Sequence, residues 1–153
     1  EISKFAHDGF ICRHNMKYWV GDEYLGFGPC AASDFAGRRF TIKPDLEGYI
    51  KGVMDKGQIL SESELVPLRE RAGEYLMLRL RTVDGIEKGE YTRSFLLPFE
   101  PIEEILLRLQ TQEYAAFTSG RWHLTPKGFM LSNQVILTLL EAQQRSKPLA
   151  QRR

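Results

Sequence analysis

The sequence predicts an α+β protein in which a segment of short strands and loops precedes a mainly helical domain with a small hairpin. Three observations support this fold class. The first 44 residues mix glycines with aromatic residues, and apolar residues from Asp45 onward recur at helical spacing. A Ser-Gly pair near residue 120 separates two short strand-like runs. The resulting order of helix, helix, hairpin and helix is winged-helix-like.

Two short strands are expected in the first part. Residues 24–28 predict a buried strand that runs into a turn, and residues 39–42 predict a second strand that stops before Pro44. Asp45 is then placed to cap a helix that continues through about Met54. Its apolar face would consist of Leu46, Tyr49, Ile50 and Val53.

Helical patterns dominate the second part. Ser63 is expected to begin a helix that ends in the turn at residues 82–85, after which residues 85–99 would form an exposed connector anchored by residues 95–97. Residues 101–111 predict another amphipathic helix. Residues 117–124 predict the hairpin, and Thr125 followed by Pro126 has the N-cap and first-turn residues of a last helix.

Composition and charge limit the function. The 153 residues carry 21 Lys+Arg against 20 Asp+Glu, a net charge of +1, which excludes the class of wholly basic polyanion-binding proteins. No apolar run is long enough to span a bilayer, and no basic segment precedes an apolar one as in a secretion signal, so a cytoplasmic protein is expected. The chain begins without Met in sequence that already looks apolar, which suggests a portion of a longer protein. Cys12 and Cys30 form neither a disulfide framework nor a CxxC pair.

Few residues have the spacing of a chemical site. His14 precedes Tyr18 and Trp19 by four and five residues, which puts an imidazole and two aromatic faces on one side of a helical turn. Imidazole is an axial ligand of haem iron, but spacing alone favours ordinary packing for this cluster. Gly26 and Gly28 allow either a ligand or another backbone segment to approach closely, and the absence of a full dinucleotide motif favours a sharp turn. The histidines lack metal-binding spacing, and no catalytic set is visible.

Seven short stretches, taken together, resemble a known family. They are EISKFA at residues 1–6, RHN and YW at 13–15 and 18–19, YLGFGP at 24–29, GRRF at 37–40, EYLMLRLR at 74–81 and LTPKG at 124–128. In this order they resemble the radical-SAM family of HemW haem chaperones and oxygen-independent coproporphyrinogen III oxidase-like proteins. The sequence departs from the family pattern at Cys30 and Ala32, where Gly and His are common, and at Arg79, where Gly is frequent.

The resemblance implies a longer parent with a radical-SAM barrel, a [4Fe–4S] cluster and S-adenosylmethionine. Residues 1–44 would be the C-terminal remnant of that barrel, and residues 45–153 a HemN/HemW-type C-terminal domain. The cluster-binding CxxxCxxC motif of the family is not among these residues, so the chain alone is expected to be inactive as an enzyme.

The resemblance also assigns roles to individual residues. His14 would be the axial ligand of haem, and Cys12 would be a rival ligand. Asn15 would hold the turn, while Tyr18 and Trp19 would pack against the porphyrin. Gly26 and Gly28 would line the cofactor edge of the barrel.

Three functions follow as expectations. The leading one is the C-terminal fragment of a radical-SAM haem chaperone, which binds haem or porphyrin and delivers haem to accepting proteins. The alternative is a fragment of an oxygen-independent coproporphyrinogen III oxidase, which performs an oxidative decarboxylation in porphyrin biosynthesis. The third is a winged-helix nucleic-acid-binding module. Nucleic acid is not an expected partner, because Lys127 is the only basic residue between Pro126 and Arg145.

The two parts are expected to differ in packing. Residues 45–153 contain enough amphipathic helix to build their own core. The first 44 residues would be irregular, loosely packed, or paired with another copy of the chain through exposed strand edges and aromatic side chains.

Overall fold

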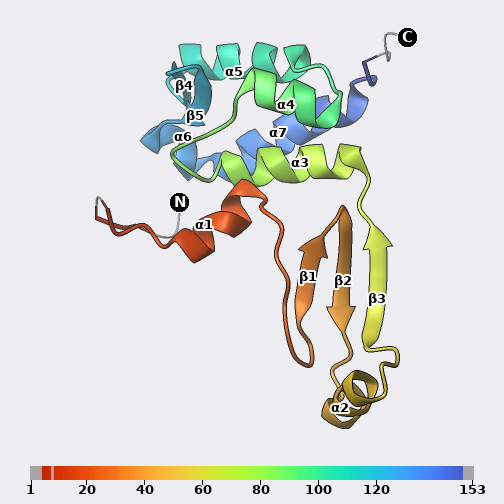
Figure 1. Cartoon of the computed structure of the whole chain (residues 1–153). Helices are drawn as coiled ribbons and strands as arrows, with labels where there is room; N and C mark the ends of the chain where they lie inside the picture. The colour runs from red at the N-terminus through yellow and green to blue at the C-terminus, as the bar shows by residue number, and fades with distance from the viewer. Residues whose placement is uncertain (1–4, 8, 150–153) are drawn as a thin grey trace. The chain divides into compact units, whose positions relative to one another are not determined.

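The computed structural model of the chain describes residues 5–7 and 9–149. In chain order, the elements are α1 (Arg13–Val20), β1 (Ala32–Phe35), β2 (Arg38–Ile42), α2 (Leu46–Met54), β3 (Leu60–Leu65), α3 (Leu68–Arg79), α4 (Lys88–Phe95), α5 (Glu100–Thr111), β4 (Ala115–Thr118), β5 (Arg121–Leu124), α6 (Pro126–Met130) and α7 (Ser132–Arg145). Figure 1 shows these elements along the chain. The predicted α+β class is confirmed, whereas the barrel remnant and the winged-helix likeness stay predictions.

The chain divides into two compact units. One contains the described residues up to Gly21 together with those from Leu68 onward, and the other contains Asp22–Pro67. The boundary predicted from the sequence at residues 44 and 45 falls inside the second of these units. As a division of a longer parent into domains, it stays a prediction.

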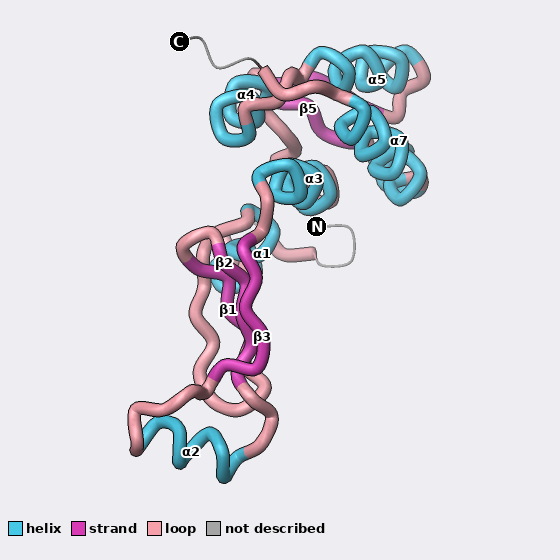
Figure 2. The backbone as a smooth tube through the Cα atoms, turned by 90° about the vertical axis from the view of Figure 1, so that its right-hand side faces the viewer, coloured by secondary structure: helices cyan, strands magenta, loops and turns pink. Residues whose placement is uncertain are grey.

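The Asp22–Pro67 unit is an antiparallel sheet in the order β1-β2-β3, with α2 between β2 and β3 in the chain. Ala36 and Gly37, both with positive φ, make the turn that aligns Phe35 with Arg38. The ladder shifts register between Thr41 and Ile42. Figure 2 shows α2 beyond one end of the sheet. Asp45 caps α2 as predicted, because its carboxylate accepts the Gly48 N–H at 2.6 Å.

Two predictions in this unit are wrong. Residues 24–28 are not a buried strand: only Tyr24 pairs, in an isolated bridge with Asp34, and Phe27 is 86% exposed. The helix predicted from Ser63 does not begin there, because residues 60–65 form β3. The strand is held by hydrogen bonds to β2, including the Arg38 guanidinium to Ser63 Oγ at 3.0 Å. Exposed charged side chains on such an edge strand oppose further strand pairing.

The larger unit holds the hydrophobic core. Its fully buried side chains come from α3, α4, α5, β5, α7 and the loops between them: Leu76, Leu80, Ile86, Tyr91, Leu97, Phe99, Ile102, Leu106, Leu124 and Leu139. Residues 85–99 are therefore not an exposed connector, as the sequence predicted. They contain α4 and several core residues, and only Leu96 of the predicted anchor turns outward, with 45% exposure.

The C-terminal elements follow the sequence closely. The hairpin β4-β5 turns at Ser119 and Gly120, which both have positive φ. Thr125 caps α6 by accepting the Gly128 N–H at 3.1 Å, as predicted. A break at Leu131 divides the last helix into α6 and α7. The Arg69 guanidinium caps the C-terminal end of α7, because it donates to the carbonyls of Gln143, Gln144 and Ser146.

Candidate functional site

The helix α1 carries the residues with the most specific sequence signal. It begins after Cys12, whose side chain makes no cap hydrogen bond, and it contacts α3 of the same unit. Gly21 ends it in the left-handed conformation, with φ of 75°, and donates its N–H to the carbonyls of Lys17 and Tyr18. A glycine is the residue best suited to this position. The eight residues of α1 are thus fixed at their C-terminal end.

The predicted haem-binding residues separate into two pairs on α1. His14 and Tyr18 lie one turn apart and are exposed, whereas Asn15 and Trp19 lie one turn apart and are half-buried. The His14 and Tyr18 rings meet edge to face, with centroids 5.3 Å apart and an interplanar angle of 84°. Their polar atoms, His14 Nε2 and Tyr18 Oη, are 3.4 Å apart. The structure therefore brings His14 together with Tyr18 on an accessible face.

The residues around His14 fit the chemical demands of haem. An axial ligand must present an imidazole nitrogen at an accessible surface, and a porphyrin needs apolar contacts. The exposed His14 meets the first demand. Phe10 and Ile11, which precede Cys12 and the helix, are 81% and 58% exposed and offer apolar surface. Cys12 is also exposed, so the rival ligand is equally accessible.

Gly26 and Gly28 lie in the other unit, and the local backbone explains why each position is a glycine. A Cβ on Gly26 would collide with the Ala32 carbonyl oxygen, and the Gly26 N–H donates to the buried Ser33 hydroxyl at 3.0 Å. Gly28 has φ of 95°, a conformation that side chains with a Cβ rarely adopt. Their predicted role at a cofactor edge stays a prediction.

The donor set does not fit a [4Fe–4S] cluster. Such a cluster is held by several cysteine thiolates, and the sequence has only Cys12 and Cys30, which lie in different units. Within residues 5–7 and 9–149, no three His, Cys, Asp or Glu side chains gather as a metal site. We derive no step through a cluster or through S-adenosylmethionine.

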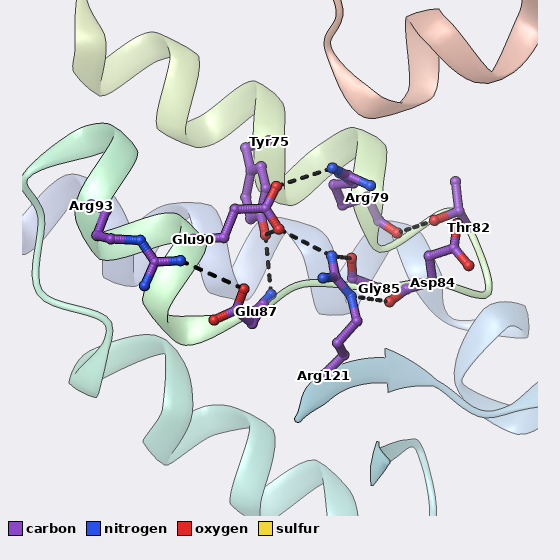
Figure 3. Close-up of polar contacts among 9 residues, drawn as sticks. All are labelled: Tyr75, Arg79, Thr82, Asp84, Gly85, Glu87, Glu90, Arg93 and Arg121. Atoms are coloured by element: carbon purple, nitrogen blue, oxygen red, sulfur yellow. Dashed lines mark hydrogen bonds and ion pairs between the residues drawn. The ribbon is translucent and has the colours of Figure 1, made fainter. Parts of the chain in front are cut away.

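A polar network centred on Glu90 was not predicted from the sequence. Figure 3 shows the Glu90 carboxylate between Tyr75 and Arg79 of α3 and Arg121 of β5. Its oxygens accept from Arg79 and Tyr75 at 3.0 and 3.1 Å, and Arg121 lies 3.1 Å away. Arg121 also donates to the carbonyls of Asp84 and Gly85. The network ties α3, α4 and β5 together.

Tyr75 is the most enclosed member of this network. Its hydroxyl donates to Glu90 and accepts the Glu87 N–H at 3.0 Å. Burial raises the pKa of Tyr75 to about 12, so the tyrosine stays neutral in the folded protein at ordinary pH. A neutral hydroxyl that makes two hydrogen bonds between elements is suited to stabilising a fold. We therefore assign this network a structural role. The sequence missed it because residues 85–99 looked like a connector; the four-residue spacing of Tyr91 and Phe95 was the available helical signal.

An open groove of about 230 Å³ lies on other elements of the same unit. It is lined mainly by residues of α5 and α7, namely Ile105, Leu109, Gln112, Tyr114, Leu131, Gln134, Val135 and Thr138. None of the residues predicted to bind haem lines it. No helix among the described residues is long and apolar enough to cross a membrane.

The comparisons with known proteins agree with the sequence resemblance. Residues 66–131 match the model of the HemN C-terminal domain. This part of the chain is therefore a HemN C-terminal domain, and the family recognised from the sequence is confirmed. Over most of its length the chain is related to proteins named haem chaperone HemW.

Two such relatives are from Lactococcus lactis subsp. lactis and Synechocystis sp. The former is 30% identical over 88% of this chain, and the latter 35% identical over 93%. The chain spans only 35% and 39% of their lengths. A solved structure titled as coproporphyrinogen III oxidase (HemN) from Escherichia coli, a radical SAM enzyme, has a TM-score of 0.56 and 16% identity, over 77% of this chain and 28% of that chain. That likeness shows the fold alone.

Proposed function

We propose that this chain is the C-terminal part of a haem chaperone, and that α1 supplies a haem-binding segment with His14 as the axial ligand. The observation that carries the proposal is the exposed pair of His14 and Tyr18 beside exposed Phe10 and Ile11. The names of the curated relatives support haem as the ligand. The cluster and S-adenosylmethionine of the radical-SAM parent would be held by residues outside this chain.

Phe10 and Ile11 leave apolar surface exposed next to α1. An aromatic side chain such as Phe10 gains free energy when its surface leaves water, at roughly 25 cal/mol per Å². Packing against a flat apolar ligand would recover that free energy, while the imidazole supplies a directional bond to the iron. Trp19 is half-buried, so we expect it to support α1 more than to contact the porphyrin.

Titration of ferric haem into the chain tests the proposal. His14→Ala should weaken binding at least about tenfold, an effect of about 1.4 kcal/mol, and should change the Soret spectrum because the axial ligand is lost. His7→Ala is the matched control, since His7 is also exposed and precedes α1. A Cys12→Ser variant tests the rival ligand.

The proposal would be overturned if His14→Ala and the unaltered chain bound haem equally, or if neither gave a saturable Soret change. Loss of binding in Cys12→Ser but not in His14→Ala would transfer the ligand role to the thiol. The oxidase alternative requires product formation from coproporphyrinogen III by the reconstituted parent, which a chaperone would not give.

A further inference from the structure

The Tyr18 hydroxyl lies within hydrogen-bond distance of one imidazole nitrogen of His14, Nε2. Tyr18 Oη lies 3.4 Å from His14 Nε2, and the edge-to-face rings keep the two side chains together. The contact spans four residues of one helix, so it forms without any partner molecule. His14 therefore has a competing partner at Nε2 before any ligand arrives.

The proton positions depend on which of the two groups donates. A neutral imidazole has one nitrogen that donates and one that accepts, and the hydrogen bond at one nitrogen decides where the proton lies. A phenol hydroxyl that donates to Nε2 holds the lone pair there and leaves the proton on Nδ1. This is the tautomer that an iron ligated through Nε2 requires, although the lone pair is engaged while the hydrogen bond exists.

We propose that Tyr18 is a positioning residue that fixes the Nδ1–H tautomer of His14 and competes with haem iron for Nε2. The inference rests on the proposed function and adds a control on it. The unbound helix has two states that matter, with Nε2 bonded to Tyr18 or free, and iron binds only the free state. Any removal of the Tyr18 hydroxyl therefore increases the fraction of His14 that can ligate.

Removing the Tyr18 hydroxyl is expected to lower the fraction of His14 in the Nδ1–H form, although it raises the fraction that can ligate iron. Without the phenol donor, the Nδ1–H form loses its stabilising hydrogen bond, so the population of the Nε2–H form rises. Haem affinity should thus increase while the Nδ1–H fraction falls. If Tyr18 only supported α1, removing its hydroxyl would not raise haem affinity and lower the Nδ1–H fraction together.

Tyr18→Phe on the full chain tests both effects, because phenylalanine keeps the ring contact with His14 and removes only the hydroxyl. Nitrogen NMR of the unliganded chain at about pH 8.5 measures the tautomer. We expect a mainly Nδ1–H His14 in the unaltered chain and a shift toward Nε2–H in the variant. Ferric haem titration should then show about two- to fivefold tighter binding by Tyr18→Phe. Tyr49→Phe, on α2 of the other unit, is the control.

The outcomes separate this inference from the proposed function. If His14→Ala weakens haem binding but Tyr18→Phe changes neither tautomer nor affinity, the inference fails and the axial ligand stands. If Tyr18→Phe weakens binding, the hydroxyl helps to hold haem and the inference is also overturned. If His14→Ala has no effect, or if no variant binds haem, both fail together.

Discussion

At the scale of single residues, two neighbouring tyrosines differ in how their hydroxyls are hydrogen-bonded. Tyr75 and Tyr91 lie with ring centroids 6.0 Å apart in one core. The Tyr75 hydroxyl has two hydrogen bonds, whereas the fully buried Tyr91 hydroxyl has no hydrogen-bond partner among the described residues. Burial raises the pKa of each to about 12. A buried hydroxyl without a partner has lost its hydration and gained no replacement.

We expect Tyr91→Phe to raise the free energy of unfolding by about 1 kcal/mol, because it removes the unpaired hydroxyl and keeps the ring. Tyr75→Phe is the matched comparison and should lower the free energy of unfolding by about 1–2 kcal/mol, because Glu90 and the Glu87 N–H lose a partner. Urea unfolding followed by circular dichroism measures both. A destabilised Tyr91→Phe would indicate a bound water or partner at that hydroxyl.

At the scale of elements, the junction between the hairpin and α6 depends on one close approach. The Tyr114 carbonyl accepts the Thr125 N–H at 3.1 Å, which joins the segment before β4 to the start of α6. The same carbonyl lies where a Cβ on Gly128 would be. Thr125 caps the helix in this region, so the cap and the glycine together fix the direction in which α6 leaves the hairpin.

Gly128→Ala should therefore lower the free energy of unfolding by about 2–3 kcal/mol, since the colliding atom belongs to backbone and cannot move aside freely. Gly73→Ala is the control. It also lies in a helix, but its Cβ would meet only the flexible tip of Leu140 at 3.3 Å, and alanine has the better helix propensity.

Thermal unfolding of the two variants measures the difference. We expect the melting temperature of Gly73→Ala to stay near that of the unaltered chain. If Gly128→Ala unfolded at the same temperature as Gly73→Ala, the junction would be more adaptable than its geometry indicates.

At the scale of the whole molecule, apolar burial is concentrated in one unit. In Asp22–Pro67, the fully or almost fully buried residues are Ser33, Ile42 and Val66. The helices α3, α5 and α7 instead share a continuous core. The resistance of a segment to local opening increases with the apolar contacts that opening would break.

Hydrogen exchange should therefore be slowest in α3, α5 and α7 and at least about tenfold faster in β1, β2 and β3. Mass spectrometry of peptides from the exchanged chain measures this. Slow exchange in the three strands, equal to that of α5, would contradict the prediction, and a dependence on protein concentration would show pairing between copies. That second result would support the self-association expected from the sequence.

Local signals in the sequence were sufficient where an element is decided by its own residues. Asp45 and Thr125 cap helices because the carboxylate or hydroxyl reaches an N–H three residues later, which needs no other segment. The Ser119-Gly120 turn and the amphipathic α5 were predicted for the same reason. The family resemblance also came from short local motifs, and the match to the HemN C-terminal domain confirmed it.

Tertiary structure decided the remaining features. Residues 60–65 have strand geometry because β2 offers a hydrogen-bonding edge, although Ser and Glu there resemble the start of a helix. Residues 88–95 form α4 although Gly89 and Thr92 are weak helix formers. The helix is stabilised because Tyr91 packs in the core and Glu90 forms ion pairs with two arginines. The sequence determined that His14 and Tyr18 lie one helical turn apart. Only the folded structure decided that both are exposed, because α1 packs with Asn15 and Trp19 half-buried and leaves the adjacent pair in water.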